Sequence, residues 1–293
     1  MADVEFGTSD VSAMLAEMEQ EDTAGRFVSK TWSPKSEGIT KIRFLPQLKS
    51  FNERIFYQKH LVHYINGVPY MCLKQTLTDE NGKQHVAEDC PFCKKAQQLY
   101  STSSKGTEEW ALAGELRAKE RYVARIIVRG KKDEKGNDTE YKPEFYEFGS
   151  KIRDMIRAAL QSGEYGLPTD LKTGRDFNLS KKGQRKNTDY SGSMFSGSSS
   201  PVFTDATRLK ALLAELPKMS YNQLVKFETK ETLQGVLNEY LNGSTDEVSA
   251  PVDNSPVSDD AIFGVAQQVV SAPAAQSAPA SVDEDIDALL DQI

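Results

Sequence analysis

The two cysteines in DCPFCKKAQ, residues 89–97, constrain the fold more than any other stretch of this chain. Cys90 and Cys93 are two residues apart, and the apolar spacing that follows predicts a helix over 91–100. Thiolates on the first turn of a helix lie near the positive end of its dipole, and their separation suits a tetrahedral ion. The pair therefore predicts half of a metal site, with a redox pair or simple burial as the alternatives.

A hairpin just upstream offers the remaining ligands. The segment HLVHYINGVPYMC has Asn-Gly at 66–67, the strongest short turn signal, and contains Cys72, the third of the three cysteines. With Asn-Gly as the turn, His63 lies opposite Tyr70 and on the same sheet face as Cys72. His60 then lies on the other face and is the second choice if a bulge shifts the register. His85, in the connection to Cys90, is the third choice.

The predicted ligand set is therefore His63, Cys72, Cys90 and Cys93. Three thiolates and one imidazole suit Zn2+ and leave no position for a reactive water, so one structural zinc is expected to hold residues 55–100 together. Three cysteines cannot all pair. The sequence also shows no signal-peptide pattern and no apolar run that would span a membrane, which favours a reducing cytosol without membrane attachment.

Charge is segregated along the chain. The net charge of −7 combines −6 over residues 1–26, −10 over residues 243–293 and +9 over the middle, residues 27–242. A basic body between acidic ends points to a polyanion partner. A solvated charged surface without a partner is the plainer alternative.

The middle, residues 27–242, is expected to be one core domain of the α+β class, built on a small barrel. Alternation predicts strands at 39–45, 55–65, 68–73, 121–129 and 141–148. Helical spacing predicts helices at 91–100, 107–119, 150–161, 205–215 and 221–241.

Both ends suggest interaction segments. Residues 1–26 contain a short amphipathic arm with Val11, Met14, Leu15 and Met18 at helical spacing. Residues 243–293 are rich in Ser, Ala, Pro and acid, which predicts a disordered tether. Its end, 281–293, has one apolar stripe among carboxylates and resembles a docking peptide, although a plain solubility tail is the alternative. The stripe consists of Ile286, Leu289, Leu290 and Ile293.

Aromatic and basic residues alternate after the metal segment. In RYVARIIVR, parity places Arg121, Arg125 and Arg129 on one strand face and Tyr122 on the other. Rings that stack on bases beside guanidinium groups that follow phosphates would suit single-stranded nucleic acid, although a core role is the plainer reading of any one ring. The mixture recurs in a Gly/Ser-rich stretch expected to be a flexible loop, with Lys181, Lys182, Arg185 and Lys186 leading to Tyr190.

Enzyme motifs are not evident. The chain lacks a P-loop, an HExxH motif and a local Ser/His/Asp arrangement, so we expect a protein that is not an enzyme. An unusual nuclease site is the alternative, because Asp89, Asp138 and Asp154 are available.

Taken in order, several motifs resemble the single-stranded DNA-binding protein of T-even-type bacteriophages. They are ITKIRFLP, the His63, Cys72, Cys90 and Cys93 set, RYVARIIV, FYEFGSKIRDMI, NTDYSGSMF and the terminal DEDIDALLDQI. The likeness spans about residues 38–200 plus the last dozen. Two departures are the acidic N-terminal arm, where the family has a basic patch, and a shorter spacing from the histidine to Cys72.

The resemblance implies an OB-fold core with a zinc subdomain and a cleft for single-stranded DNA, used in phage replication, recombination and repair in the cytoplasm of the infected bacterial host. It implies self-association through the arm and recruitment of phage replication and recombination proteins through the tail. Carried over by motif, the DNA contacts are Tyr100, Trp110, Tyr122, Tyr146 and Tyr190 for stacking, and Arg117, Lys119, Arg121 and Arg125 for phosphate, with 181–186 assisting. The alternatives are a zinc-containing protein-docking adaptor and a single-stranded RNA-binding protein.

Overall fold

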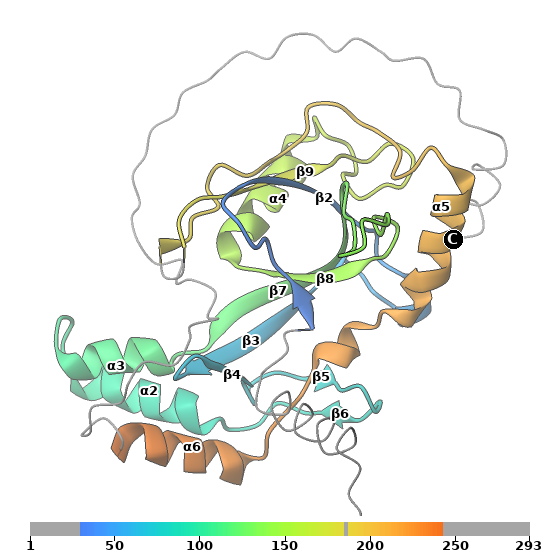
Figure 1. Ribbon diagram of the computed structural model, residues 1–293. Coiled ribbons are helices and arrows are strands. Elements are labelled where there is room, and N and C mark those ends of the chain that lie inside the picture. The colour runs from blue at the N-terminus through green and yellow to red at the C-terminus, as the bar shows by residue number, and fades with distance from the viewer. Residues whose placement is uncertain (1–29, 185–186, 243–293) are drawn as a thin grey trace, which may run out of the picture.

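The computed structural model describes residues 30–184 and 187–242 (Figure 1). The predicted arm at 1–26 and tail at 243–293, including the docking peptide at 281–293, lie outside the described residues. So do Arg185 and Lys186.

One large sheet contains eight of the ten strands found in the described residues. Its strands are β1 (Thr31–Trp32), β2 (Gly38–Phe44), β3 (Tyr57–Ile65), β4 (Val68–Met71), β7 (Lys119–Val128), β8 (Glu144–Phe148), β9 (Phe177–Lys181) and β10 (Met194–Phe195). A small second sheet pairs β5 (Leu77–Thr78) with β6 (Gln84–His85). The described α-helices are α2 (Pro91–Thr102), α3 (Glu108–Leu116), α4 (Ser150–Ser162), α5 (Ala206–Glu215) and α6 (Lys230–Asn242). Single turns of 3-10 helix lie at η1 (Lys49–Phe51), η3 (Leu216–Lys218) and η4 (Tyr221–Leu224).

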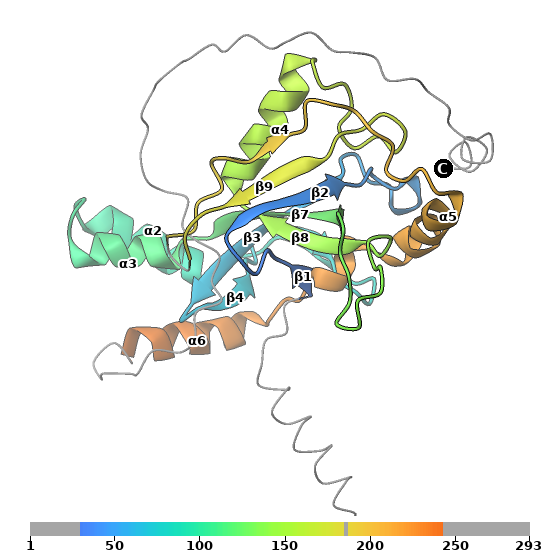
Figure 2. The same cartoon turned by 45° about the horizontal axis from the view of Figure 1, so that its top comes forward.

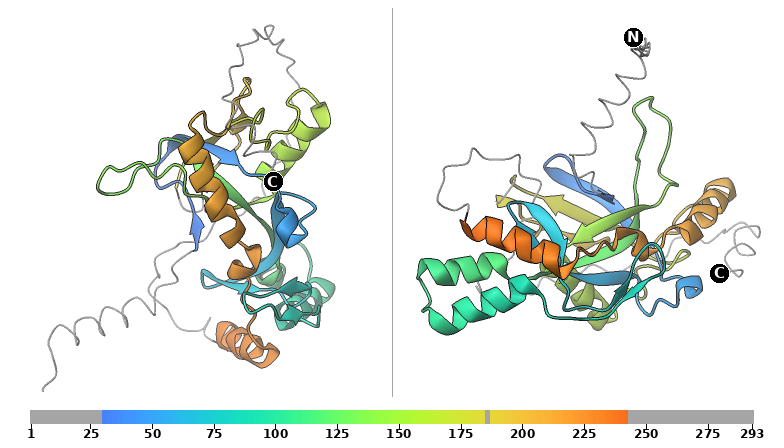
Figure 3. Two further views of the ribbon diagram at one scale, coloured as in Figure 1. Left: turned by 90° about the vertical axis from the view of Figure 1, so that its right-hand side faces the viewer. Right: turned by 90° about the horizontal axis from the view of Figure 1, so that it is seen from below.

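Strand β7 organises the sheet. One of its edges pairs with β8, and the other pairs first with β3 and then with β2, all antiparallel. Beyond β2 the sheet continues through β9 to β10. The strands curl strongly (Figure 1), while α2, α3 and α6 gather at one end and α5 at the other (Figures 1 and 3).

The mixed α+β class is confirmed. Within residues 30–184 and 187–242 the path runs from β1 to β10 without pairing between these two end strands. An OB-type closed barrel therefore stays a prediction.

Both faces of β7 are covered, which corrects the expectation of one open basic face beside one aromatic face. Tyr122 and Ile126 pack in the same core cluster as Ile152 and Ile156 of α4. Ile127, on the opposite face, packs with residues of α5, and Val123 packs with Tyr221 of η4. All eight residues from Arg121 to Val128 are consequently buried.

Other predicted elements match closely, with two exceptions. The helix predicted over 221–241 is wrong at its first half, because the 3-10 turn η4 ends at Leu224 and α6 begins only at Lys230. The flexible loop predicted around Lys181 is wrong in part, because β9 and β10 flank it and Lys182 forms a β-bridge with Asp189. Strand β9 was not predicted, because only two apolar residues, Phe177 and Leu179, alternate with polar ones before the lysines begin.

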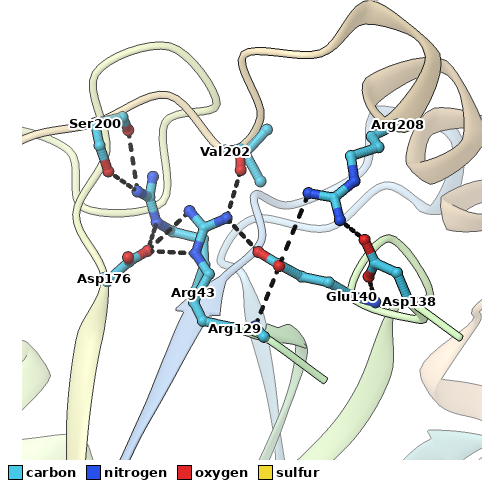
Figure 4. A network of polar contacts seen from close by, with 9 residues as sticks. Arg43, Arg129, Asp138, Glu140, Asp176, Ser200, Val202 and Arg208 are labelled. Atoms are coloured by element: carbon cyan, nitrogen blue, oxygen red, sulfur yellow. Dashed lines mark hydrogen bonds and ion pairs between the residues drawn. The ribbon is translucent and has the colours of Figure 1, made fainter. Parts of the chain in front are cut away.

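Arg43 of β2 and Arg129, the residue after β7, both bind carboxylates. Arg43 is fully buried, and its Nε donates to Asp176 Oδ1 at 2.9 Å while Nη2 donates to Ser200 Oγ at 2.8 Å (Figure 4). Arg129 contacts the same Asp176 oxygen at 3.0 Å and Glu140 Oε1 at 2.9 Å. These contacts tie β2 and β7 to the segment that precedes α5.

Close approach to this network explains Gly174. A Cβ built there would lie 2.6 Å from Nη1 of Arg43 and 2.2 Å from the carbonyl oxygen of Asp170. Neither the backbone nor a fully buried guanidinium can yield, so position 174 requires glycine.

Arg125 forms the second buried ion pair. Its guanidinium is 0% exposed, pairs with Glu53, donates to the carbonyl oxygen of Met219 at 2.8 Å and lies 4.4 Å from the ring centre of Tyr221. Glu53 also accepts the backbone N–H of Leu48 at 2.9 Å. The pair thus fastens η1 and η4 against β7.

We predict that Glu53→Gln lowers the free energy of unfolding by about 3–5 kcal/mol, because it leaves the buried Arg125 without its counter-ion. Urea unfolding followed by circular dichroism measures the change. Glu80→Gln is the control, since both partners of the Lys30–Glu80 pair are exposed, and its cost should stay within about 0.5 kcal/mol. Equal costs for the two variants would contradict a structural role for the Glu53–Arg125 pair.

Candidate metal centre and nucleic-acid interface

The hairpin places His63 and Cys72 as predicted. Asn66 and Gly67 have φ values of 50° and 78°, the left-handed pair that a two-residue hairpin turn requires. The register pairs His63 with Tyr70, and the N–H of Cys72 donates to the carbonyl oxygen of Leu61 at 2.8 Å. No bulge shifts the pairing between 62 and 71, so His63 and Cys72 share one face.

Helix α2 supplies the other two ligands from its first turn. Cys90 is the N-cap residue and Pro91 the first helical residue, which favours this start because proline needs no hydrogen-bond acceptor there. The backbone N–H of Lys94 donates to the carbonyl oxygen of Cys90 at 3.0 Å. Cys93, one residue earlier, therefore points to the same side as the Cys90 side chain.

The four ligand atoms, three Sγ atoms and one imidazole nitrogen, lie within 4.8 Å of one another. Cys72 Sγ and Cys93 Sγ are 3.5 Å apart, and His63 Nε2 is 3.3 Å from Cys90 Sγ and 3.7 Å from Cys93 Sγ. Tetrahedral ligands about 2.0–2.3 Å from a zinc ion are separated by about 3.3–3.8 Å. The residues therefore could hold one metal ion, and the site is compatible with zinc.

A backbone carbonyl orients the histidine. His63 Nδ1 lies 2.7 Å from the carbonyl oxygen of Leu116, the last residue of α3. When Nδ1 donates this hydrogen bond, Nε2 is left free to bind a cation. The sequence did not predict the Leu116 carbonyl oxygen as the partner of His63, because every residue has a main-chain carbonyl and no residue pattern identifies the one that is used.

The three cysteine side chains favour positive charge at the site. Hydrogen bonds from Cys72 and Cys93 lower the pKa of the Cys90 thiol, which favours a thiolate. Burial lowers the pKa of His63, but hydrogen bonds to Cys90 and Cys93 outweigh it and raise the pKa to about 9. A metal ion would meet the same attraction that holds this proton.

The two rejected histidines have other partners. His60 lies on the opposite face of β3, with Nε2 3.0 Å from Gln58 Oε1, and burial lowers its pKa to about 4. His85 Nε2 lies 2.9 Å from Asp79 Oδ2. Of the three histidines, His63 is therefore the one that lies in the cluster within the described residues, and its role as a metal ligand stays a prediction.

The ligands sit inside a hydrophobic cluster that reaches beyond the predicted 55–100 segment. Cys72 and Cys90 pack with Phe92 and with Leu233 and Leu237 of α6. A bound ion would therefore join the hairpin and α2 at the centre of a module that also includes α3 and α6.

Four of the predicted DNA contacts are buried in the interior. Tyr122 and Tyr146 are 3% and 2% exposed and belong to the core beneath α4. Arg121 is buried with Nε 3.1 Å from the hydroxyl of Tyr64, and Arg125 pairs with Glu53 as described above. These four side chains therefore belong to the core of this structure, and their role in DNA binding stays a prediction.

The other predicted contacts keep some exposed surface. Tyr100 and Trp110 form an edge-to-face pair with ring centres 4.6 Å apart, which joins α2 to α3. Arg117 and Lys119 lie where α3 leads into β7.

A second group of predicted DNA contacts lies at the end of β9 and in the connection to β10. The ammonium group of Lys181 donates to the carbonyl oxygen of Pro34 at 2.9 Å. Lys182 is exposed, and Tyr190 packs partly against the core. The α2–α3 pair and the connection from β9 to β10 lie on the same side of the molecule (Figures 1 and 2). Their roles in DNA binding stay predictions.

The acids considered for a nuclease site are separate. Asp138 pairs with Arg208, and Asp154 Oδ1 lies 2.9 Å from Arg153 Nη1. Within the described part of the chain, neither these two nor Asp89 belongs to a cluster of metal ligands.

We predict one zinc ion per chain in purified protein, lost in His63→Ala and retained in the control His60→Gln, as measured by metal analysis. Apparent binding free energies of structural zinc are about 10–16 kcal/mol, so chelation should remove helical circular dichroism from the α2, α3 and α6 module. A metal-free protein with an unchanged spectrum would contradict this site.

No described helix is long and apolar enough to cross a membrane. A comparison with curated proteins gave no significant match. The family model described as "gp32 DNA binding protein like" matches residues 36–237, which is more than half of the 293 residues and includes all four metal-site residues. The chain therefore belongs to the gp32-like family of DNA-binding proteins.

Proposed function

We propose that this protein binds single-stranded DNA with little sequence preference, protecting it and removing its secondary structure during phage DNA replication, recombination and repair. The site of action would be the cytoplasm of the infected bacterial host. The observation that carries the proposal is membership of a DNA-binding family over residues 36–237. A function in binding, without catalysis, is consistent with that family.

The exposed rings and cations support a mechanism. Tyr100 and Trp110 keep surface available on the metal-centred module, and each base that stacks on such a ring adds about 1–3 kcal/mol. Arg117 and Lys182 are exposed, and both would bind phosphates of the same strand. Neither kind of contact depends on base identity, so binding should tolerate any sequence.

We propose that the metal is zinc and that it is structural. His63, Cys72, Cys90 and Cys93 would complete a tetrahedral shell, leaving no position for substrate. The ion would keep α2 in place against the hairpin, and through the His63–Leu116 hydrogen bond it would also position α3 and therefore Trp110.

Three segments complete the proposed division of the chain. Residues 27–242 form the DNA-binding core, residues 1–26 associate with a neighbouring protomer along DNA, and residues 243–293 recruit phage replication and recombination proteins through the 281–293 peptide.

We predict tight, salt-sensitive binding to fluorescent oligo-dT and weaker binding to oligo-U and duplex, measured by anisotropy at two salt concentrations. Affinity for single strands should fall with a log-log slope of about −0.7 per phosphate contact, or roughly three decades per tenfold salt for four or five contacts. Trp110→Ala should weaken binding by about 1–3 kcal/mol, whereas Trp110→Phe should retain most of it because the ring remains. Absence of binding in dilute buffer would favour the adaptor, and equal binding of oligo-U would favour an RNA-binding protein.

The acidic tail is proposed to compete with DNA for the basic core. Its ten carboxylates and no basic residues resemble a polyanion, so deletion of 243–293 should tighten oligo-dT binding at low salt and flatten the salt response. The control exchanges the ten acids for Asn and Gln at unchanged length and should behave like the deletion. Unchanged affinity at low salt would count against competition.

A further inference from the structure

A groove of about 260 Å3 lies between the start of β3 and helix α4. Helix α4 packs against the sheet on the side of β9 (Figure 2). Seven residues line the groove: Ile55, Tyr57, Arg153, Ile156, Arg157, Leu160 and Gln161. None of these residues was among the predicted DNA contacts.

Helical spacing explains how α4 forms one wall. Ile152 and Ile156 are buried against the sheet, and the next stripe, Arg153, Arg157 and Leu160, follows along the edge of this contact. Leu160 is 39% exposed and Ile55, on the facing wall, is 41% exposed. Two large apolar side chains therefore face one cavity without covering each other.

The β3 wall adds an aromatic ring fixed by its neighbours. Tyr57 is half-buried, with its ring centre 5.5 Å from Tyr122 and 6.1 Å from Phe148, both edge-to-face. Packing of this kind orients the ring before any ligand arrives.

Charge at the groove is positive. Arg157 is exposed, and no ion pair of its guanidinium is found within residues 30–184 and 187–242. Arg153 pairs with Asp154, its neighbour on the helix surface, also forms a side-chain hydrogen bond with Tyr57, and lies 5.8 Å from the ring centre of Tyr122. The seven lining residues include no carboxylate. The groove therefore combines apolar and aromatic walls with the guanidinium group of Arg157, which no lining carboxylate neutralises.

We propose that this groove binds one nucleotide unit of single-stranded DNA, with the base against Tyr57, Ile55 and Leu160 and the phosphate on Arg157. The proposal rests on the proposed function and extends the DNA path to a surface beside β3, away from the Tyr100–Trp110 pair. A nucleotide fits better than a larger ligand, because the volume lies below the roughly 300–1,000 Å3 of sites for drug-sized molecules. Arginine suits the phosphate because its planar donors match the phosphate oxygens.

The test uses the full chain with its metal and fluorescent oligo-dT at several salt concentrations. Arg157→Ala should weaken binding roughly three- to tenfold and make the salt slope shallower by about 0.7, the value for one lost phosphate contact. Leu160→Ser should weaken binding roughly threefold with an unchanged slope, because only apolar contact is removed. Lys210→Ala is the matched control, since Lys210 is also an exposed cation on a helix but lies on α5, outside the groove; its affinity should equal that of the unchanged protein.

The outcomes separate the two proposals. Binding by the unchanged protein, with Arg157→Ala and Leu160→Ser both equal to Lys210→Ala, overturns the groove assignment and leaves the proposed function intact. No oligonucleotide binding by the unchanged protein overturns both. Unfolding midpoints within error of the unchanged protein verify that the substituted chains are folded, and Arg157→Lys, which keeps the charge, should restore the salt slope.

Discussion

The cluster of His63, Cys72, Cys90 and Cys93 is the contact on which one half of this molecule depends. It joins the β3–β4 hairpin to α2, and it lies inside the hydrophobic cluster that these elements form with α3 and α6. A small module of this kind buries too little apolar surface to be stable without help, and a metal ion bound at the cluster would supply additional free energy. The ring pair of Tyr100 and Trp110 belongs to this module, so DNA contacts there would depend on the ion indirectly.

The other half depends on β7, a strand buried on both faces that nevertheless contains arginines. Arg121 and Arg125 remain inside because carboxylates, carbonyls and aromatic rings replace the water that their charges lose. Arg43 on β2 follows the same rule (Figure 4). The number of basic residues in the sequence therefore overstates the positive charge at the protein surface, because some arginines are neutralised by carboxylates in the interior.

Because some arginines are buried and others are exposed, we expect DNA to contact the exposed cations. Three exposed cations lie outside the covered centre of the sheet: Arg117 after α3, Lys182 after β9 and Arg157 on α4. A flexible strand that contacts the α2–α3 module and the groove beside α4 would follow the outside of the β3–β7 pair, whose central residues are covered. A bound metal ion and the buried ion pairs would then both make the domain rigid. A rigid domain keeps the separate DNA contacts at a constant distance from one another.

Local rules were enough for the metal ligands and for most helices. Asn66 and Gly67 set the hairpin register, and strand periodicity then selects His63 over His60 from neighbours within ten residues. The roles of Arg125 and Tyr122 could not be inferred in this way, since they follow from Glu53 and from helices far along the chain that cover each face of β7. Periodicity states which residues share a face, but only the packing of distant segments decides whether that face meets water or the core.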